Sequence, residues 1–357
     1  MLRDPNTTVT WMRRVALLAV LLAFGVVVLG AYVRLTAAGL GCPDWPGCYG
    51  HLTPTGAAAG IAAGTTDQGA TPLNVGKAWR EMFHRYFAGS LVVLTLLLAV
   101  MAFAQRRSRA PTGSNVPLAL AIVATILIQA VLGMLTVTWQ VAPQIVTLHL
   151  LVGLTTLALL WWLWLTLDAQ TPRTAAPSLG RSPPVGWAHS NSISRRLALL
   201  GLVALAVQIA LGGWTSTNYA AIACPDFPTC QASWWPHMDF GHAFVLWHSP
   251  SQNYEGGVLS NPARIAIHFT HRLGALVATA ALLLAAIWIL RERSLTRAHI
   301  AAVAVLAALA LQLTIGVAMV VNGFPLWLAT AHNGGAALLL LATLALNHRL
   351  IAAGARS

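Results

Sequence analysis

The stretch Trp79-Arg80-Glu81-Met82-Phe83-His84-Arg85 stands directly before the apolar run from Tyr86 to Ala104. It brings a carboxylate, an imidazole and a guanidinium group to the mouth of a segment long enough to cross a membrane. Glu81 and His84 are three residues apart, so on a helix they share one face about a turn from each other. Ionisable groups at such a place are usually functional. A related segment, His268-Phe269-Thr270-His271-Arg272, returns late in the chain with histidine in place of the glutamate.

The composition is typical of an integral membrane protein. Hydrophobic residues make up 57% of the 357 residues and charged residues only 8%, and the mean hydropathy is +0.69. Such a chain cannot cover a water-facing surface with polar groups. Its formal net charge of +12 does not indicate nucleic-acid binding, because the arginines stand between apolar runs rather than on one basic face.

Eight apolar segments have the length of about 20 residues that a bilayer core requires. They cover residues 15–34, 82–104, 116–139, 144–167, 197–218, 263–290, 298–321 and 326–347. The first is predicted to be a membrane span rather than a cleavable signal peptide, since no small-residue cleavage site clearly follows it.

The arginines and lysines predict the orientation. With a cytoplasmic N-terminus, the outer side holds six of the 21 basic residues, and the other 15 are cytoplasmic. The outer six are Arg34, Lys77, Arg80, Arg85, Arg264 and Arg272. The positive-inside rule therefore favours a multi-pass protein of the cell inner membrane with both termini in the cytoplasm.

Two cysteine loops share the pattern C-P-D-aromatic-P-x-C. They are Cys42 to Cys48 and Cys224 to Cys230, separated by 182 positions. Both fall on the predicted outer side, where disulfides persist. We expect a Cys42–Cys48 and a Cys224–Cys230 disulfide, each closing a short loop. For the first loop, a reactive dithiol that exchanges electrons or holds a ligand transiently stays open as an alternative.

Further landmarks recur at nearly the same spacing and indicate an internal duplication. Gln312 and His332 each follow Gln129 and His149 by 183 positions, and each glutamine precedes a glycine by four residues. Four spans per repeat return the chain to the same side, which makes the repeats parallel. The predicted fold is an all-α integral membrane protein whose eight transmembrane helices form two pseudo-symmetric four-helix bundles.

The repeat also predicts the domain boundaries. Residues 1–168 form the N-terminal bundle, residues 197–357 form the C-terminal bundle, and residues 169–196, rich in Pro, Ser and Arg, form a cytoplasmic linker. We expect Gln129 and Gln312 to bridge neighbouring helices.

Four histidines lie in even-numbered spans that all start from the outer side: His84, His149, His271 and His332. Three of them sit roughly 9 to 14 Å along their helices, in the outer leaflet. A lone histidine there is more often an imidazole bonded to a neighbouring helix. Two per bundle, related by a repeat, favour an axially ligated haem over a protein-only metal site, which needs three or four ligands.

Several motifs resemble those of the haem A synthase family over nearly the full length of the chain. They are Gly30-Ala-Tyr-Val-Arg34-Leu-Thr-Ala-Ala-Gly-Leu-Gly-Cys42-Pro-Asp-Trp-Pro46 through Cys48, Glu81-x-x-His84-Arg85, Thr147-Leu-His149, His268-x-x-His271-Arg272-Leu-Gly and Ala331-His332. The resemblance implies an enzyme that oxidises a ring methyl group of haem O to the formyl group of haem A, for terminal oxidase biogenesis.

The resemblance also implies roles for individual residues. His271 and His332 would be the axial ligands of a haem b cofactor, with Arg272 nearby, and the N-terminal half would hold the substrate. There His84 and His149 would bind haem O iron, with Arg34 and Arg85 close by. We expect the arginines to suit haem propionates, although snorkelling at the bilayer edge explains them about as well.

Glu81 is the predicted catalytic residue. A carboxylate one turn from an iron ligand could take a proton, orient water or stabilise a cation during methyl oxidation. The plainer alternative is a glutamate favoured by the helix dipole, but that does not account for its place on the His84 face.

Two other functions compete with the enzyme: a non-enzymatic membrane haem carrier or insertion factor, and a diheme b-type electron-transfer cytochrome. A carrier does not require a carboxylate beside only one site, and such a cytochrome would place haems toward both membrane faces. Expected partners are haem O, haem O synthase, membrane lipid and an electron donor, either a quinol or a ferredoxin-type protein. A homo-oligomer is left open.

Overall fold

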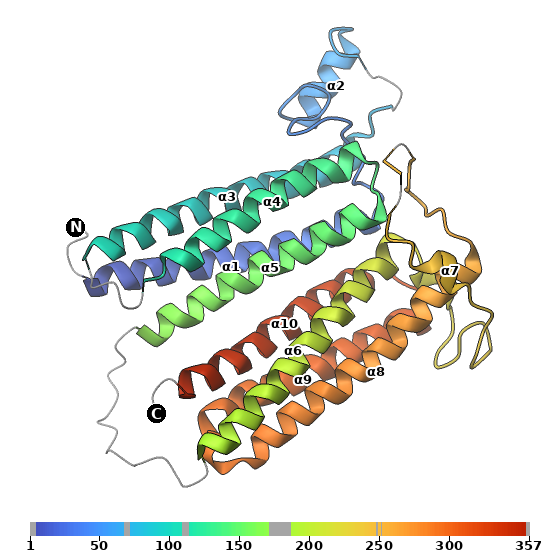
Figure 1. Ribbon diagram of the computed structural model, residues 1–357. Coiled ribbons are helices and arrows are strands. Elements are labelled where there is room, and N and C mark those ends of the chain that lie inside the picture. The colour runs from blue at the N-terminus through green and yellow to red at the C-terminus, as the bar shows by residue number, and fades with distance from the viewer. Residues whose placement is uncertain are drawn as a thin grey trace.

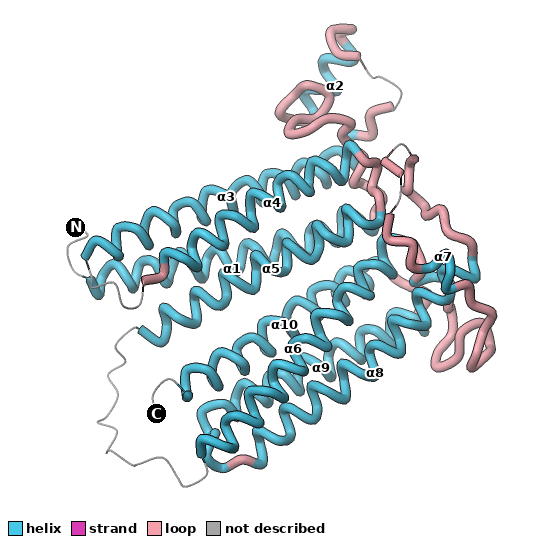
Figure 2. Tube along the Cα trace, viewed as in Figure 1, coloured by secondary structure: helices cyan, strands magenta, loops and turns pink. Residues whose placement is uncertain are grey.

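The computed structural model describes residues 5–67, 72–108, 114–170, 187–247, 249–250 and 252–354. Throughout these residues the regular secondary structure is helical, and no strand occurs among them (Figure 2). The predicted all-α class is therefore confirmed.

Eight helices in the described part of the chain are long and apolar enough to cross a membrane. They are α1 (Pro5–Leu35), α3 (Val75–Ser108), α4 (Val116–Thr138), α5 (Pro143–Gln170), α6 (Trp187–Thr217), α8 (Asn261–Arg291), α9 (Thr296–Val321) and α10 (Leu326–Gly354). Each contains most of one predicted span. Short helices α2 (Pro54–Ala62) and α7 (Phe240–Ala243) lie in the long connections, and single 3-10 turns, Ala221–Ala223 and Arg293–Leu295, precede α7 and α9.

Several helices extend beyond the apolar segment that predicted them. Helix α3 begins at Val75 rather than Met82, so Lys77, Arg80 and Glu81 belong to its first turns. Helix α6 begins at Trp187, inside the predicted linker 169–196. Residues 171–186 of that linker lie outside the described residues. Hydropathy identifies only the apolar part of a helix. Polar residues can continue the same helix beyond that part, because many of them have a high helical propensity.

The eight helices lie in two groups of four, one from each half of the chain (Figure 1). In the N-terminal group, α1 contacts α3, α3 contacts α4, α4 contacts α5, and α5 contacts α1. The C-terminal group repeats this order with α6, α8, α9 and α10. Both groups therefore have the neighbour relations of an antiparallel four-helix bundle. Pseudo-symmetry between them stays a prediction.

The two groups meet along α1 and α5 on one side and α6 and α10 on the other. The Trp161 indole donates to the Leu341 carbonyl at 2.9 Å, joining α5 to α10. Near the opposite end, the hydroxyl groups of Thr147 and Thr217 are 3.1 Å apart and join α5 to α6. Polar atoms inside an apolar environment need such partners, so these bonds fix how the groups sit together.

The long connections gather at one end of the helices, and the chain termini lie at the other (Figure 1). The connection after α7 crosses from the C-terminal group to the N-terminal one. There Tyr254, only 2% exposed, packs among residues of α4, α5 and the turn between them. Its backbone N–H donates to the Gln140 carbonyl at 3.1 Å. Lys77 and Glu255 form a looser pair at 3.9 Å.

Large apolar side chains remain exposed along the outsides of the helices. Leu21, Val93, Leu276 and Ile300 are 62%, 66%, 68% and 82% exposed. Exposed apolar rows on every side are costly in water and favourable in lipid.

The predicted orientation can be tested with reporter fusions. We expect a reporter joined after Arg106, at the end of α3, to be active only in the cytoplasm. One joined after Ala62, in α2, should be active only outside, because the positive-inside rule retains the arginine-rich connections. A reporter after Arg106 that is active outside would contradict the orientation.

Candidate functional site

The four predicted histidines lie on α3, α5, α8 and α10, one on each of the second and fourth helices of the two groups. In the N-terminal group, the rings of His84 and His149 lie edge to face with centroids 6.5 Å apart and an interplanar angle of 69°. In the C-terminal group, His271 lies near enough to His332 for the rings to interact electrostatically. The structure thus brings together the two pairs that the sequence predicted.

Each imidazole rests on a glycine of a neighbouring helix. A Cβ atom built on Gly30, Gly133, Gly212 or Gly316 would come within 2.8, 3.3, 3.1 or 3.0 Å of the ring of His84, His149, His271 or His332, respectively. Any side chain at these positions would push the ring aside, so the four glycines set where the imidazoles lie. Gly133 and Gly316 are the glycines that follow Gln129 and Gln312 in the repeat. Gly30 and Gly212 share the 182-residue spacing of the cysteine loops, a signal in the sequence that could have linked them to the histidines.

Glutamine side chains hold three of the four histidines. Gln129 donates to the His149 carbonyl at 2.9 Å. Gln208 donates to the His271 carbonyl at 3.0 Å and lies 3.0 Å from its Nδ1 atom. Gln312 lies 3.2 Å from Nε2 of His332. The helix-bridging role expected for Gln129 and Gln312 is therefore present.

The fourth histidine has no such glutamine. The internal repeat does not predict a role for Gln208, because the matching residue 182 positions earlier is Val26 rather than a glutamine. In the C-terminal pair both rings contact a glutamine side chain, whereas in the N-terminal pair Gln129 bonds only the backbone carbonyl of His149.

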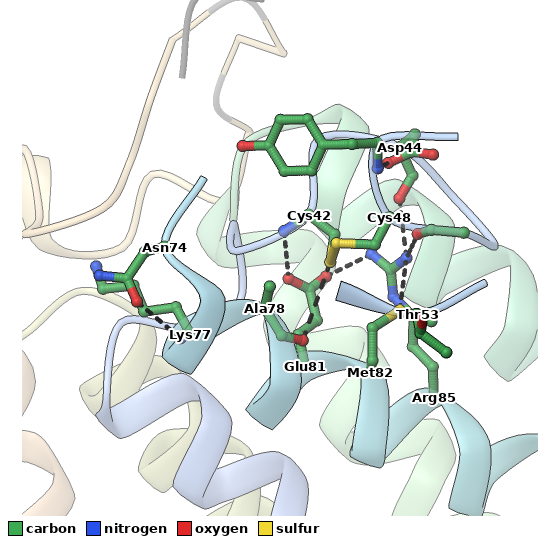
Figure 3. Close-up of a disulfide and its surroundings, with 12 residues drawn as sticks. Cys42, Asp44, Cys48, Thr53, Asn74, Lys77, Ala78, Glu81, Met82 and Arg85 are labelled. Carbon is green, nitrogen blue, oxygen red and sulfur yellow. Dashed lines mark hydrogen bonds and ion pairs between the residues drawn. A yellow bond between two sulfur atoms is a disulfide. The ribbon is translucent and has the colours of Figure 1, made fainter. Parts of the chain in front are cut away.

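Glu81 and Arg85 attach the first cysteine loop to α3 (Figure 3). Glu81 is 4% exposed, and its Oε2 atom accepts the backbone N–H of Cys42 at 2.9 Å. Its Oε1 atom accepts from Nη2 of Arg85 at 2.5 Å. Nη1 of Arg85 donates to the carbonyls of Asp44, at 2.9 Å, and of Gly47. Both oxygens of the predicted catalytic carboxylate are thus engaged by loop and arginine.

The C-terminal half repeats this anchor with a different first residue. Nε of Arg272 donates to Nε2 of His268 at 3.3 Å. Its Nη atoms donate to the Asp226 carbonyl at 2.8 Å and the Thr229 carbonyl at 2.6 Å, both in the second cysteine loop. In each half, the arginine that directly follows His84 or His271 therefore binds the backbone of a cysteine loop.

Both predicted disulfides, Cys42–Cys48 and Cys224–Cys230, are present. Each loop closes with two backbone hydrogen bonds between its second cysteine and the residue three positions later. The aspartate of each motif caps its loop: Asp44 accepts from the N–H of Tyr49 at 2.6 Å. The Thr229 hydroxyl, with the N–H groups of Ala232 and Gln231, holds the pKa of Asp226 below its usual range.

Arg34 lies between the two groups. Its Nη2 atom donates to the Ser216 carbonyl at 3.0 Å, and its guanidinium carbon lies 4.2 Å from the centroid of the Tyr219 ring. Of the three arginines predicted to suit propionates, all therefore donate to backbone carbonyls in this structure. Their contact with a ligand stays a prediction.

The donor set fits a group held between two imidazoles. Among the described residues, no three His, Cys, Asp or Glu side chains converge as a protein-only metal site would require. The 6.5 Å between the His84 and His149 rings leaves room for one metal with bonds of about 2 Å to each. The buried Nδ1 atoms of His84, His149 and His332 have no hydrogen-bond partner among the residues that the structure describes.

These features define a class: a multi-pass helical membrane protein with a pair of imidazoles in each of two four-helix groups. The profile of the cytochrome oxidase assembly protein family (COX15-CtaA) matches residues 13–344. The chain belongs to this family.

Its relatives carry one name. The heme A synthase of Shewanella oneidensis is 38% identical over 344 residues, which is 96% of this chain and 96% of the relative. The heme A synthase of Halalkalibacterium halodurans is 26% identical over 328 residues, with 90% of this chain and 91% of the relative covered. That of Erythrobacter litoralis is 29% identical over 341 residues, covering 89% and 90%.

Substituting Gly30 should test how the histidines are held. We expect Gly30→Ala to displace His84, because the new Cβ would lie 2.8 Å from its ring, and to weaken ligand binding in the N-terminal group at least tenfold. Absorbance titration of the purified protein with haem measures this.

Gly25→Ala on the same helix is the matched control, since nothing lies within 4 Å of its added Cβ. It should bind as the parent does. Equal binding by both variants would show that the glycine does not position the imidazole.

Proposed function

We propose that this protein is a haem A synthase that oxidises a ring methyl group of haem O to the formyl group of haem A, for cytochrome oxidase assembly. The observation that carries the proposal is the paired histidines, each seated on a glycine, in a chain 38% identical to a heme A synthase over 96% of its length. The family membership supports the link to oxidase assembly.

The C-terminal pair is the proposed cofactor site. His271 and His332 would hold haem b through its two axial positions. When bound, this haem would supply one-electron chemistry to the site. Gln208 contacts Nδ1 of His271 and Gln312 contacts Nε2 of His332, so each ring has one nitrogen left that could face the iron.

The N-terminal pair is the proposed substrate site. His84 and His149 would bind haem O, and Gly30 and Gly133 keep the neighbouring helices from filling the ring space. Val26 stands where Gln208 stands in the other half, and a hydrogen bond joins His84 to the Val26 backbone in place of the glutamine contact.

Glu81 is the proposed proton acceptor. Oxidising a methyl group releases protons, and Glu81 lies one helical turn from His84 on the same helix. Its ion pair with Arg85 and its bond to Cys42 hold the carboxylate in place beside the loop. His268 occupies the matching place in the cofactor half, where no such acceptor is needed.

The proposed setting is the cell inner membrane, with both termini in the cytoplasm and both sites toward the outer face. Haem O would come from haem O synthase, and the oxidation requires an oxidant such as dioxygen, which a quinol or a ferredoxin-type electron donor would help to reduce. The carrier hypothesis gives no reason for a buried carboxylate beside one site only, and so the enzyme is favoured.

Removing either proposed haem b ligand should abolish cofactor binding without preventing the protein from folding. We expect His271→Ala and His332→Ala each to lose stable haem b while still inserting into the membrane, because one axial bond then remains. Haem extracted from the purified protein gives the measurement. A haem b spectrum that survives both single changes would contradict the cofactor site.

Changing the carboxylate should stop turnover without emptying the cofactor site. Glu81→Gln should retain haem b and accumulate haem O or a partly oxidised haem, because the amide cannot take a proton at neutral pH. The loss should be at least a hundredfold in turnover, in line with general acid–base catalysis.

Glu255→Gln, which changes a carboxylate of the outer connection paired with Lys77, is the control and should keep the parent rate. Labelling of free thiols should report an intact first loop in both variants. A Glu81→Gln protein that makes haem A at the parent rate would reduce Glu81 to a loop anchor.

A further inference from the structure

We propose that Arg80 binds a carboxylate group of the ligand held by His84 and His149, which in haem O is a propionate. The inference rests on the proposed function, since that function makes the ligand a haem. Arg80 was counted only as a basic residue of the outer side in the sequence reasoning, and neither cysteine loop nor histidine motif singles it out.

Arg80 lies on the ligand face of α3. It precedes His84 by four residues, so its side chain starts from the same helix face about 6 Å nearer the outer end. The propionates of a haem extend from one edge of the macrocycle and are anions, which turn toward the polar end of a membrane protein. A guanidinium one turn outward from an iron ligand is within reach of that edge.

The guanidinium of Arg80 is available for such a ligand. Its carbon lies 5.9 Å from the centroid of the Tyr32 ring on α1, and none of the described residues offers it a hydrogen-bond acceptor or a carboxylate. An aromatic ring supports one face of a guanidinium and leaves its N–H edge open. Arg80 is half-buried, and a half-buried cation without an anion gains from binding one.

The other outer cations of the N-terminal half already have partners. Arg34 donates to carbonyls of α6, and Arg85 is bound by Glu81 and by the first cysteine loop. Lys77 pairs with Glu255. A carboxylate arriving beside His84 therefore finds Arg80 with its donors unused.

The duplication shows that this cation belongs to one site only. The residue four before His271, at the place of Arg80, is Ile267, which is fully buried. Arg264, at the place of Lys77, donates to the Leu259 carbonyl. The two halves therefore differ at this position, and any preference for a carboxylate that Arg80 provides should be confined to the N-terminal pair.

Titration with haem b and with its dimethyl ester tests the proposal on the full-length purified protein. The ester keeps the iron and the ring but carries no carboxylate. The signal of the N-terminal pair is the part of the absorbance change that His84→Ala removes. We expect the parent to bind the free acid about tenfold more tightly there, as a charge-assisted hydrogen bond gives.

Arg80→Gln should remove this preference by weakening the free acid alone, and Arg80→Lys should restore part of it. Arg14→Gln is the matched control, because Arg14 also lies over an aromatic ring, that of Trp11, at the other end of α1. It should keep the full preference.

Three outcomes would overturn the proposal. The preference could survive in Arg80→Gln, be absent in the parent, or disappear together with the binding of both forms, which would mark a structural role. Failure of the proposed function looks different: the parent then binds neither form at the N-terminal pair.

Discussion

Each imidazole lies where the neighbouring helix carries no side chain, and the arrangement of both sites depends on this contact. In a membrane, helices gain little from apolar burial against one another, so close approach at small residues becomes the main source of helix packing. Here the small residues serve a second purpose. Gly30 and Gly212 occupy the same place in their respective repeats, 12 residues before the first cysteine of each loop, and each contacts a histidine ring of the next span. The same glycines therefore determine both how closely the helices pack and where the imidazole rings lie.

The arginine that follows His84 or His271 extends this constraint to the outer surface. Arg85 and Arg272 each donate hydrogen bonds to several backbone carbonyls of a disulfide-closed loop. Because the loop is short and capped by its own aspartate, it keeps its shape, and the arginine joins it rigidly to the helix that carries the ligand. A buried guanidinium needs many acceptors, and the loop carbonyls provide them. The loops thus cover the sites as fixed parts of the bundles.

The two halves differ at the positions that bear on chemistry. In the internal repeat, Glu81 corresponds to His268, Val26 to Gln208, and Arg80 to Ile267. At two of these places the N-terminal half carries a carboxylate and a guanidinium group where the C-terminal half carries an imidazole and an apolar side chain. The proposed division into a substrate site and a cofactor site rests on these differences.

Much of the fold could be predicted from the sequence, because a bilayer requires each spanning segment to have a certain length and an apolar composition. Eight spans, the helical class, the disulfide pairs and the four histidines all follow from apolar runs, spacing and an internal repeat. The polar contacts do not follow, because they join residues from distant parts of the chain. That Arg85 binds loop carbonyls, that Arg34 crosses to α6, and that Tyr254 packs into the other half depends on how eight helices stack. An arginine near a helix end has several acceptors within reach, and only the packed structure decides which of them it meets.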